Sequence, residues 1–93
     1  MPDGDTRVRR RDNVLSTTSG AETLLVDQTT GSVHVINQTA ARVWELCADD
    51  PSVDEIVEGI AETYAIAPDE VREDVYEMVR TFSDLGVVEF LSA

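Results

Sequence analysis

Few side chains of this sequence could carry out catalysis. His34 is the single histidine of the chain and Cys47 is its single cysteine. A metal site or a proton relay built on histidine needs further ligands or partners, and no second histidine exists to supply them. Cys47 lies near the expected end of a helix among acidic residues, whereas a reactive thiolate needs a nearby cation or a helix N-terminus. The sequence therefore predicts no metal site and no cysteine nucleophile.

The sequence also gives no support for a phosphate-binding site or for acid–base catalysis by carboxylates. The five glycines are scattered over expected turns, so the chain has no glycine-rich phosphate loop. Its many carboxylates fall on the expected exposed faces of helices, where nothing would tune them for acid–base catalysis. We therefore expect a protein that is not an enzyme and holds no cofactor.

The charge of the chain limits its partners. Nineteen acidic residues stand against seven basic ones, all of them arginine, which gives a formal net charge of −12 at pH 7. Nucleic-acid affinity rests largely on cationic contacts to phosphate, so this balance argues against a nucleic-acid partner. The acidity can serve solubility alone, or part of it can meet a basic segment of a partner, and the sequence leaves both interpretations open.

Length and composition indicate one small domain. Ninety-three residues with 42% hydrophobic content suffice for a single core. No apolar run approaches the roughly 18–20 residues that span a bilayer, and the first residues lack the apolar segment of a signal peptide. One cysteine cannot form an internal disulfide. We therefore expect a cytoplasmic protein without a membrane partner.

The first twelve residues differ from the rest of the chain. They are polar, show no apolar periodicity and contain four arginines, Arg7, Arg9, Arg10 and Arg11. This pattern predicts a flexible N-terminal arm over residues 1–12, either frayed or acting as a docking tail. The folded domain is then expected over residues 13–91.

From residue 13 onward, the chain predicts three short strands followed by three helices. Strands are expected from Val14, over Leu24–Val26 and over Val33–Ile36, separated by turn residues. Helical apolar spacing follows at about 38–47, 53–64 and 68–85, and residues 87–91 predict a short last strand. This order indicates an α+β domain, in which a three-stranded antiparallel sheet is followed by three helices, of the winged helix-turn-helix type.

One segment joins the sheet to the helices. Val33–Ile36 alternates between two faces as a strand does, and Asn37 follows at once as a typical helix N-cap. Ala40, Val43 and Trp44 then recur at helical spacing. The segment therefore predicts a strand that continues into a helix with no intervening loop.

The same segment carries a family resemblance. The pattern Gly-x-Val-x-x-Ile-Asn-x-Thr-Ala-x-x-Val-Trp-Glu-Leu over residues 31–46 resembles that of PqqD-like proteins, the peptide-binding modules called RiPP recognition elements. The resemblance extends over roughly residues 13–90. Its further segments lie at residues 52–57, 67–71, 74–79 and 84–88.

The resemblance implies a function. Proteins of this family bind the leader segment of a ribosomally made precursor peptide between their third strand and third helix. A partner such as a radical-SAM enzyme, a cyclase or a protease then modifies that peptide. Carried over to this chain, the strand wall is Val33, His34, Val35 and Ile36, and the helix wall is Val71, Asp74, Val75 and Met78.

The third strand also offers a physical reason for peptide binding. Val33–Ile36 contains no proline or lysine that would protect a sheet edge, so an extended peptide could add to it as a further strand. Without peptide, the same edge could pair with a second copy in a weak homodimer. The alternative function is a winged-helix adaptor or transcriptional regulator. Acidic residues in the third expected helix argue against DNA reading.

Overall fold

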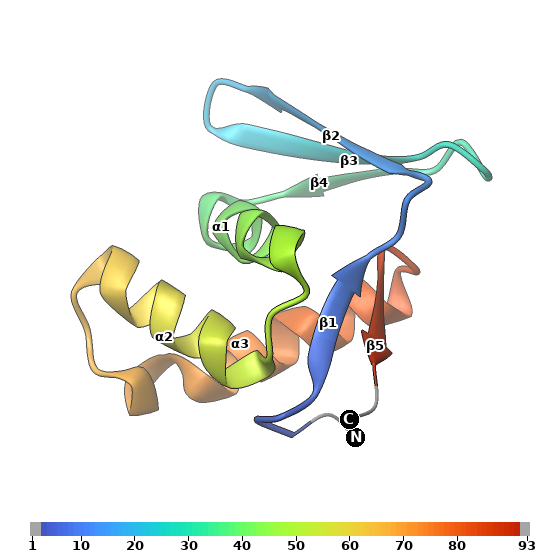
Figure 1. Ribbon diagram of the computed structural model, residues 1–93. Helices are drawn as coiled ribbons and strands as arrows, with labels where there is room; N and C mark the ends of the chain where they lie inside the picture. The colour runs from blue at the N-terminus through green and yellow to red at the C-terminus, as the bar shows by residue number, and fades with distance from the viewer. Residues whose placement is uncertain (1–2, 92–93) are drawn as a thin grey trace.

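A three-stranded antiparallel sheet lies on one side of the molecule, and the three helices lie on the other, with α1 nearest to the sheet (Figure 1). The computed structural model describes residues 3–91. The sheet has the order β2 (Val14–Ser19), β3 (Glu22–Asp27) and β4 (Val33–Ile36). The helices are α1 (Gln38–Leu46), α2 (Val53–Tyr64) and α3 (Pro68–Asp84), with a short 3₁₀ turn, η1 (Cys47–Asp49), after α1. The predicted fold class is confirmed.

A second sheet joins the two ends of the chain. Strand β1 (Arg7–Arg10) pairs antiparallel with β5 (Val88–Leu91), and Val8 is fully buried. The prediction of a flexible arm over residues 1–12 is therefore wrong for β1. One apolar residue among arginines shows no periodicity, and only the pairing with β5, about 80 residues later in the chain, makes this segment a strand. Residues 1 and 2 of the predicted arm lie outside the described residues.

The helix boundaries follow the predicted local signals. The Asn37 side chain accepts a hydrogen bond from the Ala40 N–H at 2.8 Å and so caps α1. Ser52 and Glu55 form the reciprocal capping box that starts α2. Pro68 occupies the first turn of α3, where its missing N–H costs nothing. Strand β4 and α1 are therefore joined through a single capping residue.

The core lies between the sheet and the helices. Trp44 of α1 packs edge-on against Phe82 of α3, with 6.0 Å between ring centroids. Leu25 enters the core from β3 and Val8 from β1, which ties both sheets to one interior. The core extends over α2 through Val53, Ile56, Val57 and Ile60.

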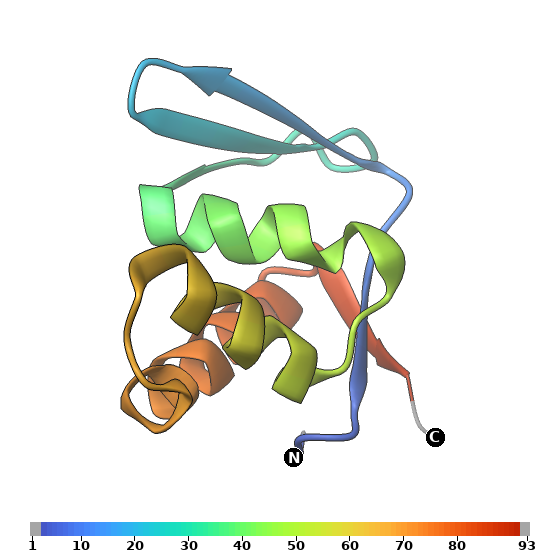
Figure 2. The same cartoon turned by 60° about the vertical axis from the view of Figure 1, so that its left-hand side comes forward.

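The other face of the β2–β3–β4 sheet has no helix against it in the described part of the chain (Figures 1 and 2). Side chains on a strand alternate between faces, so Val33 and Val35 lie on this outer side, with 55% and 61% of their surface exposed. Leu15 shares the outer face, because it pairs with Val26, which in turn pairs with Val33. His34 and Ile36 point instead toward the helices.

Arg10 connects the β1–β5 sheet to the C-terminal end of α1. Its Nε and one Nη donate to the Trp44 carbonyl oxygen at 2.9 and 2.7 Å, and that Nη also reaches the Glu45 carbonyl at 3.3 Å. The guanidinium carbon lies 4.8 Å from the centroid of the Trp44 ring. A cation at a helix C-terminus satisfies carbonyls that lack intrahelical partners and complements the helix dipole.

We therefore expect Arg10→Lys to destabilise the protein. Lysine keeps the charge but cannot make the forked contact to one carbonyl or stack its head group on the indole, so the free energy of unfolding should fall by about 1–3 kcal/mol. Urea denaturation followed by tryptophan fluorescence measures this change. Arg11→Lys is the matched control, because the exposed Arg11 side chain makes no hydrogen bond within residues 3–91. Equal stability of the two variants would contradict the capping role.

Candidate functional site

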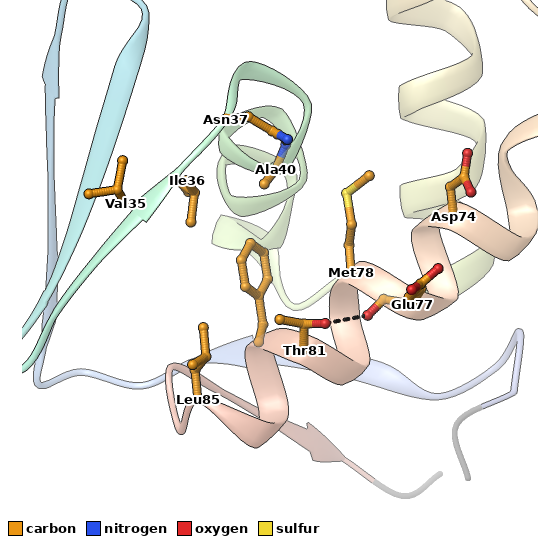
Figure 3. Close-up of a pocket in the computed structure, with 10 residues that line it drawn as sticks. Val35, Ile36, Asn37, Ala40, Asp74, Glu77, Met78, Thr81 and Leu85 are labelled. Carbon is orange, nitrogen blue, oxygen red and sulfur yellow. Dashed lines mark hydrogen bonds between the residues drawn. The ribbon is translucent and has the colours of Figure 1, made fainter.

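A groove runs between the start of α1, the edge of β4 and the exposed side of α3 (Figure 3). Its cavity volume is about 410 Å³, which is large enough for more than one side chain. Strand β4 and the start of α1 contribute Val35, Ile36, Asn37 and Ala40. Helix α3 contributes Asp74, Glu77, Met78, Thr81, Phe82 and Leu85, the last at its C-cap.

The groove changes character along its length. At one end, apolar side chains from β4 and α3 meet, with Ile36 and Phe82 largely buried and Leu85 still 37% exposed. At the other end lie the carboxylates of Asp74 and Glu77 (Figure 3). The site therefore offers an apolar cavity with an acidic end.

The backbone of β4 forms one wall of the groove, and the hydrogen bonds of that backbone can be assigned residue by residue. β4 pairs only with β3 in the described part of the chain, so its other side is a sheet edge. The Asp27 N–H donates to the Ser32 carbonyl at 2.9 Å, and these two residues continue the register in which Val26 pairs with Val33. Hydrogen-bonded and non-hydrogen-bonded pairs alternate in an antiparallel ladder.

This alternation fixes which groups of β4 point outward. His34 and Ile36 form hydrogen-bonded pairs with β3, so the N–H and C=O groups of Val33 and Val35 point away from it. The β2–β3 ladder agrees, because the Gln28 N–H donates to the Asn13 carbonyl on the opposite side. The edge therefore presents two residues with both backbone groups unpaired, at a spacing of two.

The connection between β3 and β4 holds this register. The Asp27 carboxylate accepts hydrogen bonds from the Thr29 and Thr30 N–H groups, at 2.9 and 3.3 Å, and from the Asn13 side chain at 2.8 Å. The hydrogen bond from Thr29, helped by those from Thr30 and Asn13, lowers the pKa of Asp27, although partial burial opposes the shift. Gly31 completes the turn with φ of 78°, a value that favours glycine.

The structure brings together part of the predicted strand wall. Val35 and Ile36 line the groove. Val33 lies beyond the end of the cavity and projects onto the outer face, while its backbone still faces the open edge. His34 is half-buried on the helix side and does not line the cavity.

The predicted helix wall divides in the same way. Asp74 and Met78 line the groove, whereas Val71 and Val75 are buried in the core, Val75 completely. The division follows from the helical repeat of about 100° per residue, because Val75 lies on the stripe shared by Val71 and Val79. Their side chains therefore contribute to folding rather than to the surface of the groove.

Sequence reasoning missed several lining residues, most importantly Phe82 and Leu85. The apolar period assigns both residues to the core face of α3. This is confirmed for Phe82, which is buried against Trp44 and also lines the groove, whereas Leu85 is 37% exposed there. Their spacing from Met78 is i+4 and i+7, which places all three on one side of the helix. The helical period alone therefore indicates that these residues share a side of α3 with Met78. Which stripe faces the core and which faces the groove depends on where α3 packs.

The structure agrees with the prediction that Cys47 is not a nucleophile. Cys47 is fully buried, and burial raises the pKa of its thiol to about 12, although nearby Arg10 opposes the shift. A protonated, inaccessible thiol does not attack substrates. Within residues 3–91, no group of three or more histidine, cysteine, aspartate or glutamate side chains is arranged to hold a metal ion. No helix in that range is long and apolar enough to cross a membrane.

Comparison with known families gives the site a context. The family model described as coenzyme PQQ synthesis protein D (PqqD) matches residues 22–88, from the start of β3 to the start of β5. The chain belongs to the PqqD family. The matched region includes both walls of the groove. None of the curated proteins matches the chain at a significant level.

Two solved structures share the fold. One, "TbiB1 in Complex with the TbiA(beta) Leader Peptide", has a TM-score of 0.78 at 22% identity and covers 91% of this chain and 99% of its own. The other, "Lasso peptide synthetase B1 complexed with the leader peptide", has a TM-score of 0.75 at 18% identity and covers 88% and 96%. Both are leader-peptide complexes on the fold seen here.

The assignment of the open edge is testable without a ligand. We expect the amides of Val33 and Val35 to exchange with deuterium at least roughly tenfold faster than those of His34 and Ile36, after correction for intrinsic rates, because only the latter pair donates to β3. Exchange measured by NMR resolves the four amides. Similar protection at all four would mean that the edge is paired or the register is shifted.

Proposed function

We propose that this PqqD-family protein binds the leader segment of a ribosomally synthesised precursor peptide, which adds to β4 as a further strand. The observation that supports this most directly is the unpaired backbone of Val33 and Val35 beside an apolar cavity. Unpaired N–H and C=O groups give affinity to an added strand, and side-chain pockets give specificity. The two structural relatives, which were solved with leader peptides, point to the same ligand class.

In this proposal the binding wall consists of the β4 backbone and the exposed side of α3. Val35 and Ile36 lie on the strand side, and Met78, Phe82 and Leu85 lie on the helix side. The only carboxylates that line the groove, those of Asp74 and Glu77, are exposed to solvent, so we propose a non-catalytic role. The protein holds the peptide while a separate enzyme, such as a radical-SAM enzyme, a cyclase or a protease, modifies it.

Other features of the chain fit this role. A buried, unpaired cysteine suits a reducing compartment such as the cytoplasm. Glu73, Asp74 and Glu77 lie exposed on α3, so this helix is a poor DNA-reading element and a transcriptional role is disfavoured. In the absence of peptide, we propose that the open edge of β4 can pair weakly with a second copy of the chain.

The principal experiment is a titration of the protein with the leader segment of a candidate precursor peptide from the same genome. Val35→Pro removes one outward N–H and places a ring at the edge, so we expect affinity to fall roughly tenfold or more. Isothermal titration calorimetry measures the affinity, and circular dichroism confirms that the variant folds. Val35→Ala is the matched control, because it keeps the N–H and removes only an exposed side chain. Unchanged affinity in a folded Val35→Pro protein would exclude strand addition.

Charge at the acidic end of the groove leads to a second expectation. Asp74 and Glu77 line one end of the groove, and Glu70 lies one helical turn before Asp74. Like charges at this spacing repel, and a basic residue of the leader would relieve the repulsion. We expect binding to weaken as salt rises and Asp74→Asn to slow association, because rim charges act mainly on the rate of encounter.

Stopped-flow fluorescence at low and high salt measures both effects. Glu62→Gln is the matched control, since Glu62 is an exposed acid of α2 outside the groove. Rates that do not change with salt, together with wild-type behaviour of Asp74→Asn, would show that these carboxylates are only a solvated surface.

A further inference from the structure

The connection between α2 and α3 lies on the side of the molecule away from β5 and carries an exposed apolar surface (Figures 1 and 2). In this α2–α3 segment, residues 62–70, every residue is exposed, and the five central ones, Tyr64–Pro68, have aromatic or aliphatic side chains. Tyr64 and Ile66 leave 43% and 40% of their surface exposed, and no residue of the segment lines the groove. Single exposed apolar side chains are common, but within residues 3–91 no other run of five exposed residues is wholly apolar. A gathered apolar surface of this kind indicates a contact site.

The α2–α3 segment has a fixed shape. The Ile66 N–H donates to the Ala61 carbonyl at 3.0 Å, which is the outer hydrogen bond of a Schellman motif at the end of α2. Ala65 adopts the left-handed conformation there, with φ of 55°, at a position where glycine is most common. The hydroxyl oxygens of Tyr64 and Thr39 lie 3.4 Å apart and connect the segment to α1. A surface that is ordered before contact loses less conformational entropy on binding.

Acidic residues surround the apolar centre of the segment. Glu62 precedes it and Asp69 and Glu70 follow it, and the Asp69 side chain is 95% exposed. Arg72 reaches Asp69 only at 3.9 Å, because its closer partner is Asp54. An apolar centre with a polar or charged rim is the usual anatomy of a protein–protein contact surface. The sign of this rim indicates a partner surface with lysine or arginine around an apolar pocket.

We propose that the α2–α3 segment docks the enzyme that modifies the peptide. The inference rests on the proposed function, in which a separate enzyme acts on the peptide while this protein holds it. Because the segment lies outside the groove, peptide and enzyme can be bound at the same time. A second copy of this chain is a poor occupant, since its net charge is −12 and its Arg7 and Arg9 are paired with acids of their own chain.

The test uses the full chain and a purified enzyme from the same genome. Radical-SAM, cyclase and protease candidates are screened for one that modifies the candidate precursor faster when this protein is present. Biolayer interferometry then measures the affinity of that enzyme for the protein. Isothermal titration calorimetry measures the affinity of the leader for the same protein samples, and circular dichroism confirms that each variant folds.

Two variants change the segment without touching the groove. The double variant Tyr64→Ser with Ile66→Ser should lower enzyme affinity roughly tenfold or more and keep leader affinity within about twofold, because central apolar anchors dominate an interface. Glu62→Lys should lower enzyme affinity roughly threefold, mainly at low salt, because it reverses a rim charge. A lysine at the C-terminal end of α2 is favourable for the helix, so this variant should fold.

Leu15→Ser is the matched control. Leu15 is 52% exposed, like the residues of the segment, but it lies on the outer face of the β2–β3–β4 sheet. We expect this variant to bind both the enzyme and the leader as wild type does.

Other results separate the possible failures. Wild-type enzyme affinity in both segment variants would overturn the inference and leave the proposed function intact. A loss of enzyme affinity in Leu15→Ser alone would do the same and would assign the enzyme to the outer face of the sheet. A folded double variant that also loses leader affinity would assign the segment to the peptide site instead.

Two further results are decisive. A loss confined to the double variant would support the docking surface and overturn the basic rim of the partner. No leader binding by the wild-type chain, or no enzyme that it assists, would overturn the proposed function itself.

Discussion

Within residues 3–91, the backbone of β4 is hydrogen-bonded on one side only, and the other parts of the site lie around this open edge. An unprotected strand edge is a liability that proteins usually suppress with charge, proline, bulges or a covering element. Here the edge carries valines and is placed beside an apolar cavity instead. Because the Asn37 cap joins β4 directly to α1, the strand edge and the start of α1, which both line the cavity, are held together.

Helix α3 serves two surfaces at once. Val71, Val75 and Val79 bury one stripe in the core, while Met78 and Leu85 leave an adjacent stripe partly exposed to the groove. A chain of 93 residues has little interior to spare, so the helix that completes the core also builds the site. Changes on the core stripe should act on stability, and changes on the groove stripe should act on binding.

Three of the four arginines near the N-terminus have structural partners in a strongly acidic chain. Arg9 forms an ion pair with Asp50 at 3.1 Å, and Arg7 lies 3.5 Å from the carboxylate of Glu55. Arg10 donates to the Trp44 carbonyl at the C-terminal end of α1 and also stacks on the Trp44 ring. The two exposed ion pairs contribute little to stability by themselves. Arg10 matters more, because it connects the paired ends of the chain to the helix that begins at the groove.

The sequence by itself determined the features that depend on neighbouring residues. Asn37, the Ser52 capping box and Pro68 marked the helix starts, because a cap satisfies N–H groups within one turn of itself. The alternation over Val33–Ile36 likewise predicted a strand. Tertiary structure alone decided the rest. β1 exists because a strand from the far end of the chain pairs with it, and the packing of α3 decided that Phe82 and Leu85, rather than Val71 and Val75, face the groove. Periodicity separates the stripes of a helix, but only contacts between distant segments determine what each stripe meets.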